Sequence, residues 1–67
     1  MLERYILVYP NGSFMVMDDN SGGYPYEGQE PFIFYSIKDA QNYKIICKDY
    51  NFVLKKLNYI YEVIQDV

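Results

Sequence analysis

Two runs of β-forming residues flank the tripeptide Pro10-Asn11-Gly12, and this feature limits the fold more than any other in the sequence. The runs cover residues 4–9 and 13–18 and consist mainly of tyrosine, branched aliphatic residues, phenylalanine and methionine. β-Branched and aromatic residues favour extended backbone, and Asn-Gly between two such runs is a strong turn signal. The chain is therefore predicted to begin with an antiparallel β-hairpin.

A three-residue loop with Gly12 in the left-handed region sets the register of this hairpin. We favour this loop over a two-residue one because it places opposite charges across the strands. The expected cross-strand pairs are Val8 with Phe14, Ile6 with Val16, and Arg4 with Asp18. Both faces of the hairpin are then apolar: one carries Ile6, Val8, Phe14 and Val16, and the other carries Tyr5, Leu7, Tyr9, Met15 and Met17.

A stripe of apolar residues in the second half of the chain predicts an amphipathic helix over residues 37–57. Ser36 can act as its N-cap, with Asp39 in the place of the usual capping-box glutamate. The lysines at 55–56 would then lie in the last turn, and Asn58 can take a left-handed capping conformation. The stripe recurs at spacings of three and four and consists of Ala40, Tyr43, Cys47, Tyr50, Leu54 and Leu57.

Two shorter segments complete the expected fold. Residues 32–35 read as a short third strand, and residues 59–65 as a fourth, because both are rich in aromatic or β-branched side chains. Tyr61 and Ile64 also continue the helical stripe, so a longer helix is the alternative for the last segment. The sequence predicts a single α+β domain over residues 1–67, with the order ββ(β)αβ and one long helix on one face of a hairpin-led antiparallel sheet.

One helix covers only one face of such a sheet, although both faces of the hairpin are apolar. We expect the Ile6 and Val8 face to lie beneath the helix. The opposite face mixes tyrosine with methionine, residue types that are enriched at protein interfaces. It either contacts a partner or is covered by the loop of residues 19–31 acting as a flap. The predicted binding residues on this face are Tyr5, Tyr9, Met15 and Met17.

The small size of the chain favours association with another copy. A domain of 67 residues buries only about 60% of its unfolded surface, so its stability is marginal. Cys47 is the only cysteine and there is no histidine, so the sequence offers no disulfide or zinc framework. Oligomerisation is a common compensation, and we expect a homodimer or a larger oligomer.

The residue types available argue against catalysis. Without histidine the chain lacks the commonest general base and metal ligand, and Cys47 falls on the apolar stripe, where a buried thiol is inert. We therefore expect a structural cysteine, no catalytic residues, no cofactor and no metal site. Asp18 and Asp19 could bind a hard cation, but the calcium-loop pattern around them is absent, and a solvated strand end is the simpler interpretation.

The charge and hydropathy of the chain limit its surroundings. A net charge of −3 argues against binding the nucleic-acid backbone, which requires lysine and arginine. No targeting segment is visible at the N-terminus, and no apolar stretch approaches the roughly 18 residues of a membrane span. We expect a soluble cytoplasmic protein with no membrane partner.

The loop between the hairpin and the third strand is the second candidate for binding. Gly22 and Gly23 could aim backbone amides at a phosphate, while Tyr24 and Tyr26 could stack on a base. No lysine or arginine lies between Arg4 and Lys38 to neutralise that phosphate. The alternatives are contact with a partner protein and a purely structural loop, and the predicted binding residues here are Ser21, Gly22, Gly23, Tyr24 and Tyr26. Ile45 is also notable, because it points away from the stripe among the lysines of the helix.

The chain resembles small proteins encoded by bacteriophages in its order of segments: the hairpin, residues 18–26, and the short aromatic strand that ends at Ser36, with Ala40 and Tyr43 downstream. The most specific part of this resemblance is Ser21-Gly-Gly-Tyr-Pro25. It implies a host-takeover or anti-defence factor in the cytoplasm of the host cell, one that binds and inhibits a host protein. The alternative that it implies is a protein that sequesters a signalling nucleotide. It assigns no functional residue.

Overall fold

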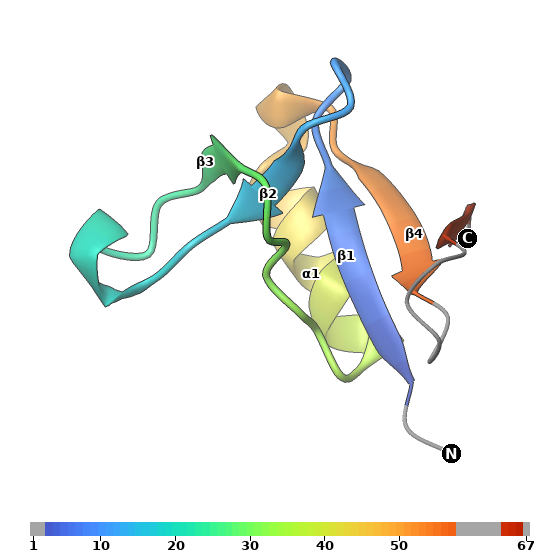
Figure 1. Ribbon diagram of the computed structural model, residues 1–67. Coiled ribbons are helices and arrows are strands. Elements are labelled where there is room, and N and C mark those ends of the chain that lie inside the picture. The colour runs from blue at the N-terminus through green and yellow to red at the C-terminus, as the bar shows by residue number, and fades with distance from the viewer. Residues whose placement is uncertain (1–2, 58–63, 67) are drawn as a thin grey trace.

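A computed structural model describes residues 3–57 and 64–66 of the chain, and these form one helix packed against an antiparallel sheet (Figure 1). The five strands lie in the order β3-β2-β1-β4-β5, which confirms the predicted α+β class. The strands are β1 (Arg4–Val8), β2 (Phe14–Val16), β3 (Tyr26–Gly28), β4 (Val53–Leu57) and β5 (Ile64–Asp66). The helices are α1 (Ile37–Ile46) and the 3₁₀ turns η1 (Asp19–Ser21) and η2 (Lys48–Tyr50).

The predicted turn of the hairpin is confirmed. Val8 pairs with Phe14, and Gly12 has a φ of 94°, in the left-handed region that glycine adopts without cost. The Tyr9 amide donates to the Ser13 carbonyl at 2.8 Å, and the Ser13 amide donates to the Asn11 side chain at 2.9 Å. The turn therefore follows from local chemistry alone.

Beyond Val8 the two strands of the hairpin separate, so the predicted pairs Ile6–Val16 and Arg4–Asp18 are wrong. The segment of residues 32–34 passes between them: the Phe32 amide donates to the Met15 carbonyl at 3.0 Å. Tyr5 and Phe34 then exchange two backbone hydrogen bonds of 2.7 and 2.8 Å. The predicted third strand is thus reduced to a single bridge. The loop instead supplies β3, which pairs along the full length of β2.

The helix begins as predicted and ends earlier than predicted. Ser36 is the N-cap, and its hydroxyl accepts from the Asp39 amide at 3.4 Å. The helix stops at Ile46, and Asn51, with a φ of 59°, turns the chain back. Residues 53–57 then form β4, which pairs with every residue of β1. A helix over these residues would have left that edge of β1 without hydrogen-bond partners, and this is why the expected helix over 37–57 is wrong.

The last predicted strand falls partly outside the described residues. Ile64–Asp66 forms β5, antiparallel to β4, which agrees with the strand expected over residues 59–65 for its final part. Residues 59–63 and the expected cap at Asn58 lie outside the described part of the chain.

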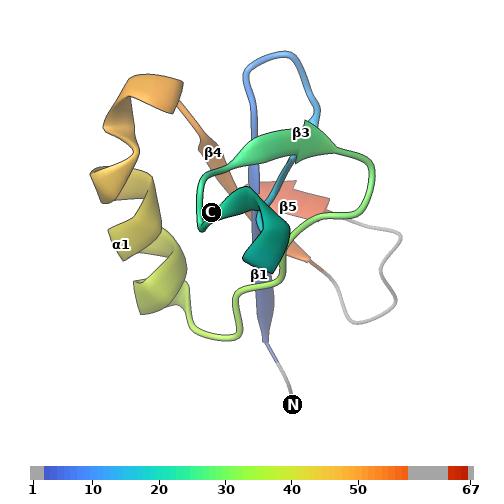
Figure 2. The same cartoon turned by 90° about the vertical axis from the view of Figure 1, so that its left-hand side faces the viewer.

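The helix covers the face of the sheet that was expected to remain open. Figure 2 shows α1 on one side of the sheet, and the core beneath it comprises Tyr5, Leu7, Met15, Phe34, Ala40, Phe52 and Leu54. The expectation that the Ile6 and Val8 face lies beneath α1 is therefore wrong. The short helix approaches through Ala40, and the long tyrosine and methionine side chains fill the space that remains. Ile6 and Val8 are also buried, on the opposite face of β1.

Candidate functional site

The structure divides the nine predicted binding residues into two groups. Tyr5 and Met15 are buried, and Tyr9 and Met17 are half-buried against the same core. The Tyr5 hydroxyl donates to a carboxylate oxygen of Glu3 at 2.6 Å, so this tyrosine has a polar partner at the rim of the sheet. These four side chains stabilise the fold. The other five residues lie on or beside the loop after β2.

That loop forms an ordered arm, which we define as residues 18–25. Asp18 caps η1: its carboxylate accepts from the Ser21 amide at 2.9 Å, and its own amide donates to the Ser21 hydroxyl at 3.1 Å. The chain then turns through Gly22 and Gly23, with φ of 65° and 85°. The Tyr26 hydroxyl donates to the second Asp18 oxygen at 2.7 Å. The part of the arm that contains η1 extends away from the sheet (Figure 1), and these hydrogen bonds fix its shape.

The hydrogen bonds on Asp18 also favour its ionised form. The Tyr26 hydroxyl, and after it the Ser21 amide, lower the pKa of Asp18 because they stabilise the ionised carboxylate. The same contact raises the pKa of the Tyr26 hydroxyl. At neutral pH the arm therefore presents a fixed negative charge beside Gly22 and Gly23.

A hollow of about 410 Å³ next to the glycines has the wrong charge for a phosphate. It is lined by Met17, Asp18, Asp19, Gly22, Gly23 and Phe32. Two of these side chains are acidic and none is basic, so a phosphate placed there would meet repulsion. The Gly22 amide already donates to the Asp19 carbonyl at 3.3 Å. A phosphate would therefore bind there only if the remaining backbone amides outweighed its repulsion by the two carboxylates.

A second hollow, of about 310 Å³, lies between the arm and the C-terminal end of α1. We call it the arm–helix surface. Its most exposed apolar side chains are Tyr24 and Ile46, which are 75% and 77% exposed, followed by Tyr50 at 41%. The Tyr43 hydroxyl joins the two walls by donating to the Gly23 carbonyl at 3.3 Å. The complete lining is Gly23, Tyr24, Pro25, Tyr43, Ile46, Cys47, Asp49 and Tyr50.

Two titratable groups of the arm–helix surface, Tyr43 and Cys47, pack against the core. Burial, and after it a hydrogen bond with the Cys47 thiol, raises the pKa of Tyr43 to about 12. Tyr43 therefore keeps its proton at neutral pH and acts as a hydrogen-bond donor. Cys47 is half-buried and packs against the core, so it is less buried than the sequence predicted.

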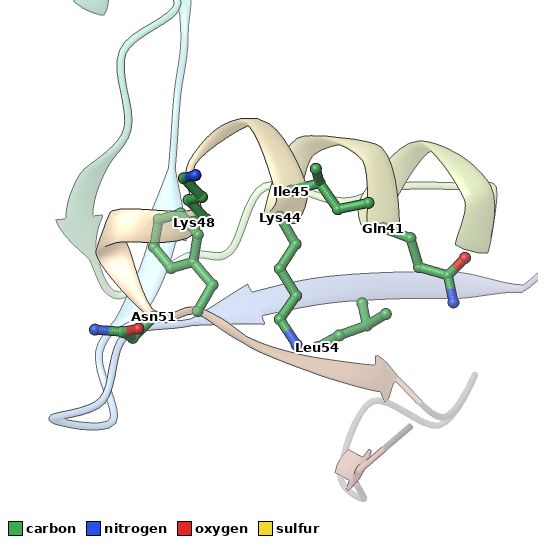
Figure 3. A pocket seen from close by; sticks show the side chains of 7 residues that line it. Gln41, Lys44, Ile45, Lys48, Asn51 and Leu54 are labelled. Carbon is green, nitrogen blue, oxygen red and sulfur yellow. The ribbon is translucent and has the colours of Figure 1, made fainter.

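A groove of about 680 Å³ lies on the other flank of α1, between the helix and β4 (Figure 3). Lys44 and Lys48 carry positive charge along it, and Ile45 is 69% exposed. The sequence had indicated that Ile45 points away from the core, and this is confirmed. We call this feature the α1–β4 groove; its lining is Gln41, Lys44, Ile45, Lys48, Asn51, Phe52 and Leu54.

Sequence reasoning missed Ile46 and Tyr50 as members of an exposed surface. Tyr50 had been placed on the buried stripe of a longer helix, whereas it lies in η2 and stacks on Phe52 at 5.2 Å between ring centroids. The helical spacing gave no signal for Ile46, because it follows Tyr43 by three residues and so falls on the same side of the helix, whereas Ile45 points away from the stripe.

The described part of the chain contains neither a metal-binding cluster nor a membrane-spanning helix. Within residues 3–57 and 64–66, no group of three or more acidic or cysteine side chains lies close enough to hold a metal ion. None of the helices in this part of the chain is long and apolar enough to cross a membrane. Comparison with models of known protein families, with curated proteins and with solved structures found no match to this chain.

Proposed function

We propose that this chain is a non-catalytic binding protein that recognises a partner protein through the arm–helix surface. The observation that carries the proposal is the grouping of Tyr24, Ile46 and Tyr50 around one hollow, each of them an apolar or aromatic side chain that is exposed to solvent. Large apolar side chains that remain exposed together on a small domain are a common mark of an interaction site. Tyrosine in particular is enriched among the residues that dominate binding energy.

Contacts within the domain hold these side chains in place, so the binding surface is already ordered before a partner binds. Tyr24 follows a turn held by Asp18 and Ser21, and the arm is joined to α1 by the Tyr43 hydrogen bond. Tyr50 is stacked on Phe52, a buried residue of the core. A surface held in this way loses little conformational entropy when a partner binds.

The resemblance to bacteriophage proteins implies that the partner is a host protein and that binding inhibits it. This part of the proposal rests on the Ser21-Gly-Gly-Tyr-Pro25 segment, which contributes Tyr24 and Pro25 to the arm–helix surface. A phage-encoded inhibitor acts in the cytoplasm of the host. It needs no catalytic group, because occupying a functional surface of its target is sufficient.

The test is affinity capture from bacterial lysate with immobilised wild-type protein and two variants. Tyr24→Ala removes a side chain of the arm–helix surface. Tyr35→Ala is the matched control, because Tyr35 is 62% exposed and lies just before α1, at the end of the helix away from Ile46. We expect the wild type and Tyr35→Ala to retain the same host protein and Tyr24→Ala to lose it. Equal retention by both variants would exclude this surface.

Sequestration of a small nucleotide is the second candidate, and one observation favours it. Gly22 and Gly23 both adopt positive φ directly before the exposed Tyr24, as a loop that presents amides to an anion can do. The carboxylates of Asp18 and Asp19 oppose it. Native mass spectrometry of protein purified without denaturation distinguishes the two functions, because only the second predicts a retained ligand of nucleotide mass that is released on unfolding.

A further inference from the structure

The charges of this chain are divided between two parts of the fold. Residues 5–37 contain four acidic residues and no lysine or arginine. Residues 38–57, which form α1, η2 and β4, contain five lysines and only two aspartates. The domain therefore has an acidic side that includes the arm and a basic side that includes the α1–β4 groove. A charge division of this kind favours contact between unlike sides of two copies.

The arm forms the projecting end of the acidic side. None of the residues of η1 is buried, and Figure 1 shows η1 projecting from the sheet. Asp18 and Asp19 lie at its base and in its first turn, and Tyr24 is the most exposed large apolar residue on it. Tyr24 lines the hollow on the side of the arm that faces α1, whereas Asp18 and Asp19 line the hollow next to the glycines. An arm that enters a groove can therefore place the tyrosine ring on an apolar wall and its carboxylates near cations.

The basic side provides a matching concave surface. In the α1–β4 groove, Lys44 and the exposed Ile45 come from α1, and Lys48 comes from η2 (Figure 3). The amide side chains of Gln41 and Asn51 lie at the two ends of the groove and can bond to backbone groups of an inserted segment. The lining contains two cations and no carboxylate.

The arm of a molecule does not reach its own groove. The arm meets α1 at Tyr43 and Ile46, whereas the groove is bounded by Gln41, Lys44 and Ile45 on the other flank of the same helix. The two features therefore meet only between copies. A contact between two different surfaces continues into chains or rings, unless each copy places its arm in the groove of the other at the same time, which closes a two-fold dimer.

We propose that this protein associates with itself head to tail, with the arm of one copy docked in the α1–β4 groove of the next. Tyr24 then contacts Ile45, and the arm carboxylates pair with Lys44 and Lys48. This goes beyond the proposed function and also affects it, because docking buries Tyr24. The self-associated form then does not bind the partner, and the monomer does.

The first experiment is sedimentation of the full chain at several protein concentrations, in low and in high salt. The average mass should rise with concentration and exceed that of a dimer in about 50 mM salt, and return toward the monomer in about 500 mM salt. Lys44→Glu should raise the dissociation constant of self-association about tenfold or more. Lys38→Glu makes the same charge change on the same helix outside the groove lining, and should have less than about one third of that effect.

A mixing experiment tests the head-to-tail geometry. The groove variant, Lys44→Glu with Lys48→Glu, keeps an intact arm, and the arm variant, Asp19→Asn with Tyr24→Ser, keeps an intact groove. Each alone should be monomeric, and an equimolar mixture should form a 1:1 dimer and nothing larger, because it offers one intact arm and one intact groove. Circular dichroism confirms that both variants are folded, which is expected because all four side chains are exposed.

Three results would overturn the proposal. The wild type could remain monomeric in low salt at concentrations up to about 1 mM. The groove variant could still self-associate, which would indicate a symmetric contact elsewhere. The mixture could remain monomeric although each variant is folded. None of these outcomes touches the proposed function, because the groove variant keeps the complete arm–helix surface and should still capture the host protein.

Discussion

Replacement of Met15 by alanine should strongly destabilise the domain. Met15 has no exposed surface and lies in the core beneath α1. Full burial of a methionine side chain contributes about 1.5–3 kcal/mol, and the cavity left behind adds to the loss, so we expect about 2–4 kcal/mol. A domain of this size has a total stability on the order of 5 kcal/mol. The variant should therefore be only marginally folded at room temperature.

Met17→Ala is the matched control for this prediction. Met17 has the same side chain two residues further along and is directed to the same face, but it is only half-buried at the edge of the core. Its replacement should cost less than about half as much. Chemical denaturation of the three proteins measures both losses. If Met15→Ala and Met17→Ala cost the same small amount, below about 0.5 kcal/mol, the tyrosine and methionine face is a solvent-exposed surface and the assignment of the core is wrong.

Three further predictions concern the titratable groups. Because the pKa of Asp18 is lowered in the folded state, its carboxylate stabilises the fold at pH values above the pKa of the unfolded carboxyl, and this stability is lost as the pH falls through the pKa of the folded state. Denaturation over an acid pH series should show the loss of stability, and Asp18→Asn should remove that part of the pH dependence. The pKa of Tyr43, raised from 10.0 to about 12, predicts stability that is present below pH 10 and lost as the pH rises toward 12. Ultraviolet titration should show a tyrosinate that forms near pH 12 and is absent from Tyr43→Phe. Cys47→Ala should cost about 1–2 kcal/mol in thermal or chemical unfolding and preserve binding to the partner; a fully folded variant that binds nothing would mean that the thiol is functional.

The features predicted correctly from sequence are those determined by neighbouring residues. The turn depends on Asn11 and Gly12, and the start of α1 depends on the Ser36 hydroxyl and the Asp39 amide. In each case the relevant contact spans two or three residues, so the local chemistry is sufficient. The α+β class follows because the hairpin signal at residues 4–18 and the start of the helix at Ser36 are well separated along the chain.

The features predicted incorrectly depend on contacts between distant residues. Leu54 fits a helical stripe and a strand equally well, and only the open edge of β1 selects the strand. The insertion of residues 32–34 between β1 and β2 likewise depends on hydrogen bonds from Phe32 and Phe34 to the hairpin. Nothing in a local window of sequence contains this information.

The candidate site was predicted in part for the same reason. The arm was identified from its glycines and tyrosines, which mark a loop locally. Its second wall, formed by Ile46 and Tyr50, depends on where α1 ends and how it meets the arm through Tyr43. The face of Tyr5 and Met15 was chosen for its composition, but composition does not determine which side of a sheet a helix covers.

The most direct test of the proposed binding surface is calorimetric titration of the captured partner with wild-type protein, Tyr24→Ala and Tyr35→Ala. If Tyr24 is an anchor of the interface, its removal should cost about 2 kcal/mol or more, which raises Kd about thirtyfold. Tyr35→Ala should leave Kd within about twofold of the wild type. Equal affinities for all three proteins, with all three shown to be folded, would contradict the proposal that the arm–helix surface binds the partner.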